Sequence, residues 1–380
     1  MEILNAIALT MLKPQMSPLQ LMNLYQETGS ATAIVENRHN IENVIPEATP
    51  HLKQILSGLD SALILAEQEI KFCEAHSIKV LHYGSKDYPQ RLMNCEDAPI
   101  VLYFCGNGNL NPAKVINIIG TRQCSVYGQD IIRHFIEDLK KTHPEILVVS
   151  GLAYGVDIQA HRNALRMEMN TVGVLAHGLD TIYPSLHRET AKQMVAHGGL
   201  LSEYPRGTRP EKRNFVQRNR IVAGMSDATI LVESAAKGGG LITCDIANSY
   251  SRDVFAFPGP VSAPYSSGCN NLIRNHSAQL ITSAEDFIKD MGWENDLILE
   301  RAKSKGIERQ LFPDLSPEET LIVEALKKGD LHVNEIAIHT TSHFMNELIL
   351  TLFRFLTRFC QFGRILMFVS LNQTSLHLRQ

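Results

Sequence analysis

Six apolar runs in the middle of the chain restrict the fold more than any other feature of the sequence. They read VINII, ILVVS, TVGVLA, GLLSE, ATILVES and DVFAFPG; each ends at or near a glycine or serine, and most precede a helix-length segment. A continuous apolar strand is buried on both faces, so its alternation with helices predicts a mostly parallel sheet with right-handed crossovers. We therefore predict an α/β fold whose core is an extended, Rossmann-like, doubly wound sheet.

The segments on either side of these runs have different patterns and predict further domains. Residues 1–77 show helical spacing with turn punctuation, which indicates a small helical domain. Short strand-like runs then lead into the sheet, so we assign 78–290 to the central domain. Residues 291–315 read as a charged linker. A Ser-Pro helix start then opens a domain of three short helices over 316–380, which is compatible with a winged helix.

The composition excludes several functional classes. The 380-residue chain has 36 Lys and Arg against 40 Asp and Glu, so binding to a nucleic acid would require a local basic patch. Its seven cysteines form no CxxC pair, which favours reduced thiols in the cytoplasm over disulfides or structural zinc. The sequence shows no export signal, no membrane span, and neither the G-x-G-x-x-G nor the P-loop motif. We therefore predict no membrane association, no metal and no cofactor.

Loops after the predicted strands carry residues suited to binding an anion. Gly120-Thr121-Arg122 joins a close backbone approach to a hydroxyl and a guanidinium; the alternative is that this arginine pairs with a neighbouring carboxylate. A second loop begins Ser150-Gly151 and leads into a helix. A further one places Gly238-Gly239-Gly240 before a helix, which leaves N–H groups free for an oxyanion. Because parallel strands end at one edge of the sheet, we expect these loops to gather there.

Asp157 and His161 follow the second loop, four positions apart on one helix face. Such a pair could bind a metal or act in acid–base chemistry, but no third ligand and no nucleophile lies nearby in the sequence. We interpret the pair as a structural hydrogen bond.

The segment 203–220, EYPRGTRPEKRNFVQRNR, is a basic cluster. It contains six cations and two acids in a chain whose net charge is −4, and Tyr204 and Phe215 lie among the cations. Cations neutralise phosphates and aromatic rings stack on bases, which is the combination that single-stranded nucleic acid requires. The alternative is a solvated helix face. Arg218-Asn219-Arg220 also anchors the helix that continues at Ile221.

Taken in order, these motifs closely resemble the DNA-processing protein A family (DprA, also called Smf). The resemblance rests on GTR at 120–122, SGLAYGVDIQAHRNAL at 150–165, GVLAHGLDTIYPSLHRE at 173–189, SEYPRGTRPEKRNFVQRNRIVAGMSDATILVES at 202–234, and on GGGLITCDIA, FAFPGPV and SGCNNLI. It extends from about Ile78 to Ile288. The family implies an extended Rossmann core that binds single-stranded DNA, an N-terminal SAM-like helical domain, a C-terminal winged helix and no catalytic activity.

The resemblance also implies a role and partners. Family members receive incoming single strands in natural transformation, protect them and help load the RecA recombinase past single-strand-binding protein, and they form homodimers through the core. In this sequence Arg122 would be the pocket arginine, Lys212 and Phe215 the basic and base-stacking pair, and Ile273 and Leu280 apolar dimer contacts. The nucleic-acid-binding residues that we predict are Gly120, Thr121, Arg122, Ser150, Gly151, Lys212, Phe215, Arg218, Asn219, Arg220, Gly238, Gly239 and Gly240.

Two features depart from the family pattern. The three-glycine loop replaces the commoner Ser-Gly version at Gly238-Gly239, which keeps the backbone donors and removes one hydroxyl. From about Thr341 the tail no longer resembles a winged helix, because the wing strand with its glycine turn is absent, so we expect a winged-helix-like domain with an atypical end.

Two other functions remain open from the residues alone. The first is a Rossmann enzyme of the nucleotide phosphoribohydrolase type, which also holds a phosphate with glycine loops; the sequence lacks the Gly-Thr-x-x-Glu arrangement of that class, and Asp245 would be the residue to test. The second is a transcription factor that reads duplex DNA through the C-terminal helices, whose last helix has few polar residues that could contact bases.

Overall fold

The computed structural model describes residues 1–294, which lie in a compact unit that extends from Met1 to Leu297. The predicted domain 316–380 lies outside the described residues, and so does the predicted linker 291–315 beyond its first four positions. The described part contains nine strands: β1 (Lys79–His82), β2 (Val101–Gly106), β3 (Val115–Ile119), β4 (Leu147–Ser150), β5 (Thr171–Leu175), β6 (Gly198–Ser202), β7 (Ala228–Leu231), β8 (Asp253–Ala256) and β9 (Gln279–Leu280).

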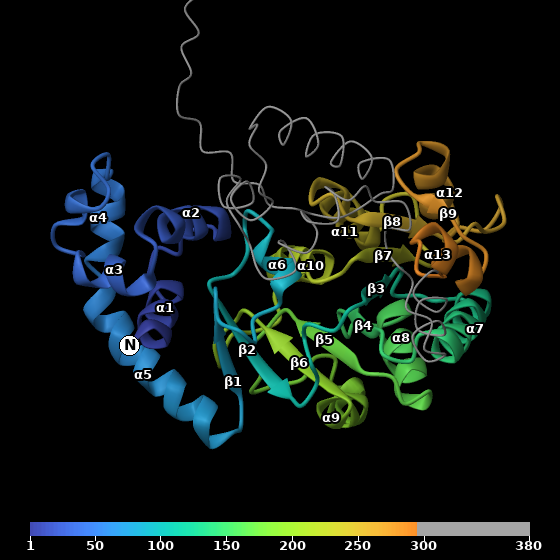
Figure 1. Cartoon of the computed structure of the whole chain (residues 1–380), viewed down its shortest axis with the longest axis horizontal. Helices are drawn as coiled ribbons and strands as arrows, with labels where there is room; N and C mark the ends of the chain where they lie inside the picture. The colour runs from blue at the N-terminus through green and yellow to red at the C-terminus, as the bar shows by residue number, and fades with distance from the viewer. Residues whose placement is uncertain (295–380) are drawn as a thin grey trace, which may run out of the picture. The chain divides into compact units, whose positions relative to one another are not determined.

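These strands form one sheet in the order β1-β2-β6-β5-β4-β3-β7-β8-β9 (Figure 1). The pairs β1–β2 and β2–β6 are antiparallel, and every other neighbouring pair is parallel. The predicted α/β class with a mostly parallel, Rossmann-like sheet is therefore confirmed, and the strand-like runs before β3 extend this sheet at one edge.

Helices cover both faces of the parallel strands. They are α6 (Gln90–Met93), α7 (Val126–Thr142), α8 (Val156–Arg166), α9 (Arg188–Ala196), α10 (Lys212–Gly224), α11 (Gly239–Ser249), α12 (Ser267–Arg274) and α13 (Ala284–Asp290), with a short 3-10 turn η2 (Ser185–His187) before α9. One face packs against α10, α11 and α12, and the other packs against α7, α8, α9 and α13.

Strand β3 illustrates why apolar runs form buried strands. Side chains alternate between the two faces of a sheet, so each face needs its own set of apolar residues. Val115 and Ile119 pack in the core beneath α10 and α11, whereas Ile116 and Ile118 pack in the core beneath α7 and α8. All five residues of the strand are buried. Asn117, the polar member, donates its side-chain amide to Thr229 Oγ1 at 2.8 Å.

The N-terminal segment is helical. It contains α1 (Glu2–Thr10), α2 (Pro18–Thr28), α3 (Ala31–Glu36), the 3-10 turn η1 (Ile41–Asn43), α4 (Pro50–Leu56) and α5 (Leu59–Ala75). Ser17 starts α2 with a capping box, and Ser30 and Thr49 cap α3 and α4, so polar side chains satisfy the free N–H groups of these helices. Helices α1 and α5 contact β1, and Figure 1 shows α5 beside that strand at the sheet edge.

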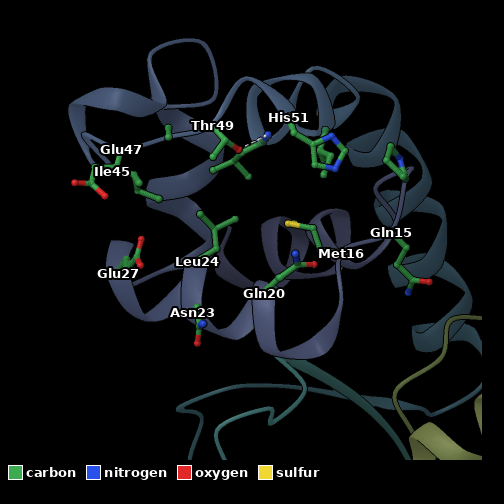
Figure 2. Close-up of a pocket in the computed structure, with 14 residues that line it drawn as sticks. Gln15, Met16, Gln20, Asn23, Leu24, Glu27, Ile45, Glu47, Thr49 and His51 are labelled. Atoms are coloured by element: carbon green, nitrogen blue, oxygen red, sulfur yellow. Dashed lines mark hydrogen bonds between the residues drawn. The ribbon is translucent and has the colours of Figure 1, made fainter.

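A cavity of about 320 Å³ lies within this helical segment. In Figure 2, Leu24 and Met16 extend toward its centre, and Glu27 and Glu47 lie together at one end. None of the residues that line this cavity belongs to the predicted nucleic-acid site. The site described next lies at the sheet instead.

Candidate nucleic-acid interface

The sheet has a topological switch point between β3 and β7. From β3 the chain adds β4, β5 and β6 on one side, and it then returns to add β7, β8 and β9 on the other side. In doubly wound sheets, ligands bind beyond the carboxyl ends of the strands at such a point. Here the loop after β3 and the loop after β7 meet, because the Thr121 N–H donates to the Glu233 carbonyl oxygen at 2.7 Å. The predicted Gly120-Thr121-Arg122 loop therefore lies at this switch point.

Glycines allow the loops at the switch point to pack closely. A Cβ added to Gly240 would lie 2.8 Å from Leu231 Cδ1 and 3.5 Å from Gly120 Cα, so the loops after β3 and β7 meet through their backbones. Gly155, with φ +76°, passes directly under the loop after β3, where a side chain would collide with the Thr121 carbonyl oxygen. A side chain at position 155 would therefore displace the loop that holds Arg122.

Arg122 and Phe215 lie side by side although they come from distant parts of the chain. The guanidinium carbon of Arg122 is 5.4 Å from the centre of the Phe215 ring, which is within the range of a cation–π contact. Arg122 is exposed, and Phe215 is half-buried on the first turn of α10. Among residues 1–294, no ion pair joins Arg122 to a carboxylate, which is the arrangement that the alternative interpretation required.

Two exposed tyrosines lie on the neighbouring loops and were not among the predicted site residues. Tyr183, after β5, is 45% exposed, and its ring centre is 5.9 Å from that of Phe215. Tyr154, after β4, is 42% exposed, and its ring centre is 5.0 Å from that of His187. The available signal was an aromatic residue in a loop that follows a buried strand. Aromatic rings therefore follow β4, β5 and β6 at the same edge of the sheet.

The predicted basic cluster divides into exposed and engaged cations. Arg209, Lys212 and Arg213 are exposed around the start of α10, and Asn219 is half-buried on the same helix. Arg206 is also exposed, but its Nε lies 3.4 Å from the Glu69 carboxylate of α5. Only part of the cluster is therefore available to a ligand.

Arg218 and Arg220 differ from the exposed cations that we expected, because both are buried. Arg218 is 4% exposed and donates to the carbonyl oxygens of Gly151, at 2.6 Å, and Val174. Arg220 is 5% exposed and donates to Glu203 and to the Asp97 carbonyl oxygen. Burial lowers the pKa of Arg218, although the nearby Asp157 carboxylate opposes that effect. Both arginines face the sheet and hold α10 against it.

The remaining predicted glycine and serine positions vary in accessibility. Ser150 is buried and donates to the Ile118 carbonyl oxygen at 2.6 Å, and Gly151 is buried against the Arg218 guanidinium. Gly239 is exposed at the start of α11, Gly238 is half-buried and Gly240 is buried. Asp245, the residue singled out for an enzymatic role, is exposed on α11.

Asp157 and His161 are buried on α8 and bond to different partners. The His161 Nδ1 lies 2.7 Å from Thr171 Oγ1, and the Ala153 N–H donates to Asp157 at 3.3 Å. Burial lowers the pKa of His161 to about 3, with smaller contributions from His187 and Arg218. Burial also raises the pKa of Asp157, against the opposing effect of Arg218. Each residue thus makes a hydrogen bond inside the fold, which agrees with the structural role that we predicted for the pair.

The fold and this edge of the sheet define the class: a doubly wound α/β protein with exposed cations and aromatic rings at the carboxyl ends of its parallel strands. The comparison with known families is specific. The family described as DNA recombination-mediator protein A matches residues 79–292. The chain belongs to this family.

Named relatives agree with this assignment. The chain is 38% identical over 229 residues to Protein Smf of Synechocystis, a match that covers 58% of this chain and 57% of the relative. It is 34% identical over 241 residues to the DNA processing protein DprA of Streptococcus pneumoniae, which covers 62% of this chain and 84% of the relative. The match thus spans less than two thirds of the Synechocystis relative's own length.

Two solved structures resemble this fold. The X-ray structure of DprA from Streptococcus pneumoniae aligns with a TM-score of 0.58 at 28% identity, covering 72% of this chain and 98% of that one. DprA from Helicobacter pylori, described by its single-stranded DNA binding mode, aligns with a TM-score of 0.52 at 29% identity, covering 57% of this chain and 96% of that one. In residues 1–294 of the present chain, no helix is long and apolar enough to cross a membrane.

Proposed function

We propose that the chain is a non-enzymatic recombination mediator that binds single-stranded DNA at the carboxyl edge of its sheet. The observation that carries this proposal is the contact between Arg122 and Phe215, which joins the loop after β3 to the start of α10. A guanidinium and an aromatic ring side by side suit an unpaired strand, because one neutralises a phosphate and the other stacks on a base.

The geometry suggests how each residue takes part. Arg122 and Lys212 neutralise backbone phosphates, and the exposed Gly239 at the start of α11 offers its backbone N–H. Phe215 stacks on a base beside Arg122. Arg218 and Arg220 are left out of the proposed phosphate contacts, because their guanidinium groups are buried and bonded within the protein.

A binding measurement tests this proposal. The full chain would be titrated against a fluorescent oligothymidine at several salt concentrations, and binding followed by anisotropy. Phe215→Ala should weaken binding about tenfold, since a stacked base contributes about 1–3 kcal/mol. Arg122→Ala should weaken binding and lower the slope of log affinity against log salt by about one, since one phosphate contact is lost.

Two matched variants control for indirect effects. Arg166→Ala removes an exposed arginine at the C-terminal end of α8, where it pairs with Glu137. This variant should leave both affinity and salt slope unchanged. Phe215→Leu keeps an apolar side chain without a π-face and should resemble Phe215→Ala in binding. Unchanged affinity and slope in both Arg122→Ala and Phe215→Ala would refute the proposed site.

The finer role follows from the same proposal. As a recombination mediator, the chain would protect incoming single strands in natural transformation and help load RecA on DNA covered by single-strand-binding protein. A strand-exchange assay with RecA, DNA pre-coated with single-strand-binding protein and the full chain tests this role. Stimulation by the wild type that Arg122→Ala loses would support it, and equal exchange with and without the chain would refute it.

We place the proposed homodimer at the far edge of the sheet. Leu280 lies in the edge strand β9 and is 49% exposed, and Ile273 is half-buried on the preceding α12. An exposed apolar residue on an edge strand suits pairing with a second copy. Leu280→Lys should convert a dimer to a monomer in sedimentation analysis, and a wild-type chain that sediments as a monomer at all concentrations would refute the assignment.

A further inference from the structure

Glu69 is an unusual residue for its position on α5. Ala62, Ala66 and Cys73 form the buried stripe of this helix, and Glu69 lies in that stripe with 3% of its surface exposed. A buried carboxylate is costly unless hydrogen bonds or a cation compensate for its charge. The structure supplies both kinds of partner from one residue of a distant loop.

That residue is Arg206, in the loop between β6 and α10. Its backbone N–H donates to the Glu69 carboxylate at 2.9 Å, and its side-chain Nε lies 3.4 Å from the other carboxylate oxygen. The Arg206 guanidinium also lies over the ring of Phe72, with 5.2 Å between the guanidinium carbon and the ring centre. Glu69 and Phe72 are three positions apart, so they face the loop together.

The opposite side of the same loop is held by the loop after β5. The Gly207 N–H donates to Asp180 Oδ1 at 3.0 Å, and the Gly178 N–H donates to the Thr208 carbonyl oxygen at 3.2 Å. The segment 205–208 is therefore fixed between α5 and the loop that carries Tyr183. Four residues later the chain starts α10 at Lys212, with Phe215 on its first turn.

We propose that Glu69 is a positioning residue for the nucleic-acid site, through which the N-terminal helices set the place of Lys212 and Phe215. This inference rests on the proposed function and adds a role for the helical segment. Glu69 is buried on a helix that carries none of the proposed contacts, so it acts through Arg206 and not by touching DNA. The Arg206 side chain is itself partly exposed, and its Nε faces Glu69.

The test compares variants of the full chain by anisotropy with the same oligothymidine. Glu69→Ala should weaken binding about five- to tenfold, because it releases the loop that leads to Lys212 and Phe215. Glu69→Gln keeps an oxygen acceptor for the Arg206 N–H and should bind within about twofold of the wild type. Glu67→Ala and Glu74→Ala, exposed on the same helix, should bind as the wild type does.

A second measurement works without DNA. Hydrogen exchange of the segment 203–211 should be faster in Glu69→Ala than in the wild type, with β4 unchanged, because the Arg206 N–H loses its acceptor. If the wild type does not bind the oligothymidine, the proposed function fails, and this measurement still reports whether Glu69 holds the loop. Faster exchange with wild-type affinity and slope would overturn the positioning role. If Glu69→Ala fails to fold, Arg206→Ala replaces it in the test. This variant keeps the backbone N–H that Glu69 accepts, so its affinity should stay within about threefold of the wild type. A tenfold loss of affinity with a lower salt slope would instead make Arg206 a phosphate contact.

Discussion

Two cations on α10 should respond to alanine substitution in opposite ways. Arg218→Ala should destabilise the fold, whereas Lys212→Ala should weaken DNA binding and leave stability nearly unchanged. The reason is that Arg218 is 4% exposed, whereas Lys212 lies in the exposed class at the start of the helix. The contrast tests directly how the basic cluster is divided.

The expected magnitude follows from what Arg218 contacts. Its guanidinium donates to the Gly151 carbonyl oxygen at 2.6 Å and to that of Val174, and it is the cation that opposes the desolvation of Asp157. Removing one partner of a buried charged group costs about 3–5 kcal/mol, because the remaining charge and acceptors stay buried. Substitution of an exposed residue such as Lys212 changes the free energy of unfolding by no more than about 0.5 kcal/mol.

Urea denaturation followed by circular dichroism at neutral pH measures the first effect, and anisotropy with oligothymidine measures the second. We expect Arg218→Ala to lower the urea midpoint strongly. We expect Lys212→Ala to keep the midpoint and to lower the salt slope of binding by about one. The reverse result, a wild-type midpoint for Arg218→Ala together with lost affinity and a lower slope, would show that the Arg218 guanidinium faces the ligand.

Two further predictions concern residues of the core and of the loops that support the proposed site. Burial lowers the pKa of His161 to about 3, so protonation of this residue favours the unfolded chain. The free energy of unfolding should therefore keep the full contribution of neutral His161 above a pH of about 6.5. It should fall by up to about 1.4 kcal/mol per pH unit as the pH decreases toward 3. Denaturation over this range should therefore show a shallower pH dependence for His161→Asn than for the wild type, and identical slopes would contradict the burial. Gly155→Ala should lower the free energy of unfolding by about 1–3 kcal/mol because of its positive φ, and by more because the new Cβ collides with Thr121. The same variant should also weaken DNA binding. Gly207→Ala, at a similar φ of +77° with open space around it, should cost only the backbone strain, and equal losses in the two variants would show that the collision has no effect.

Much of the fold could be predicted because strands that are buried on both faces appear in the sequence as runs of apolar residues. Four of the five residues of β3 are apolar, and the burial of the strand on both faces is visible in the sequence as that apolar run. The place of Gly120-Thr121-Arg122 at the sheet edge followed from the same reasoning. The contact of Arg122 with Phe215 depends on how two loops are placed in space, so it could only be anticipated as a convergence.

The buried arginines could not be distinguished by counting charges. A local charge balance treats Lys212 and Arg218 alike, although the helical period places Arg218 on the same face as the apolar Ile221 and Val222. That periodicity was the signal available to separate them. Glu69 carried a similar signal, since it occupies a buried-stripe position on α5, but its partner Arg206 is too distant in sequence to be paired without coordinates.

We propose that separate loops form one site for an unpaired strand. A double-mutant cycle between Arg122→Ala and Phe215→Ala, measured by oligothymidine anisotropy with excess duplex DNA as competitor, tests this arrangement. The guanidinium carbon of Arg122 lies 5.4 Å from the centre of the Phe215 ring, so the two side chains interact. We therefore predict that the double variant loses less binding free energy than the sum of the single losses, by about 0.5–1 kcal/mol. We also predict that the wild type prefers the single strand. Strictly additive losses, or a preference for the duplex, would show that the loops do not form one such site.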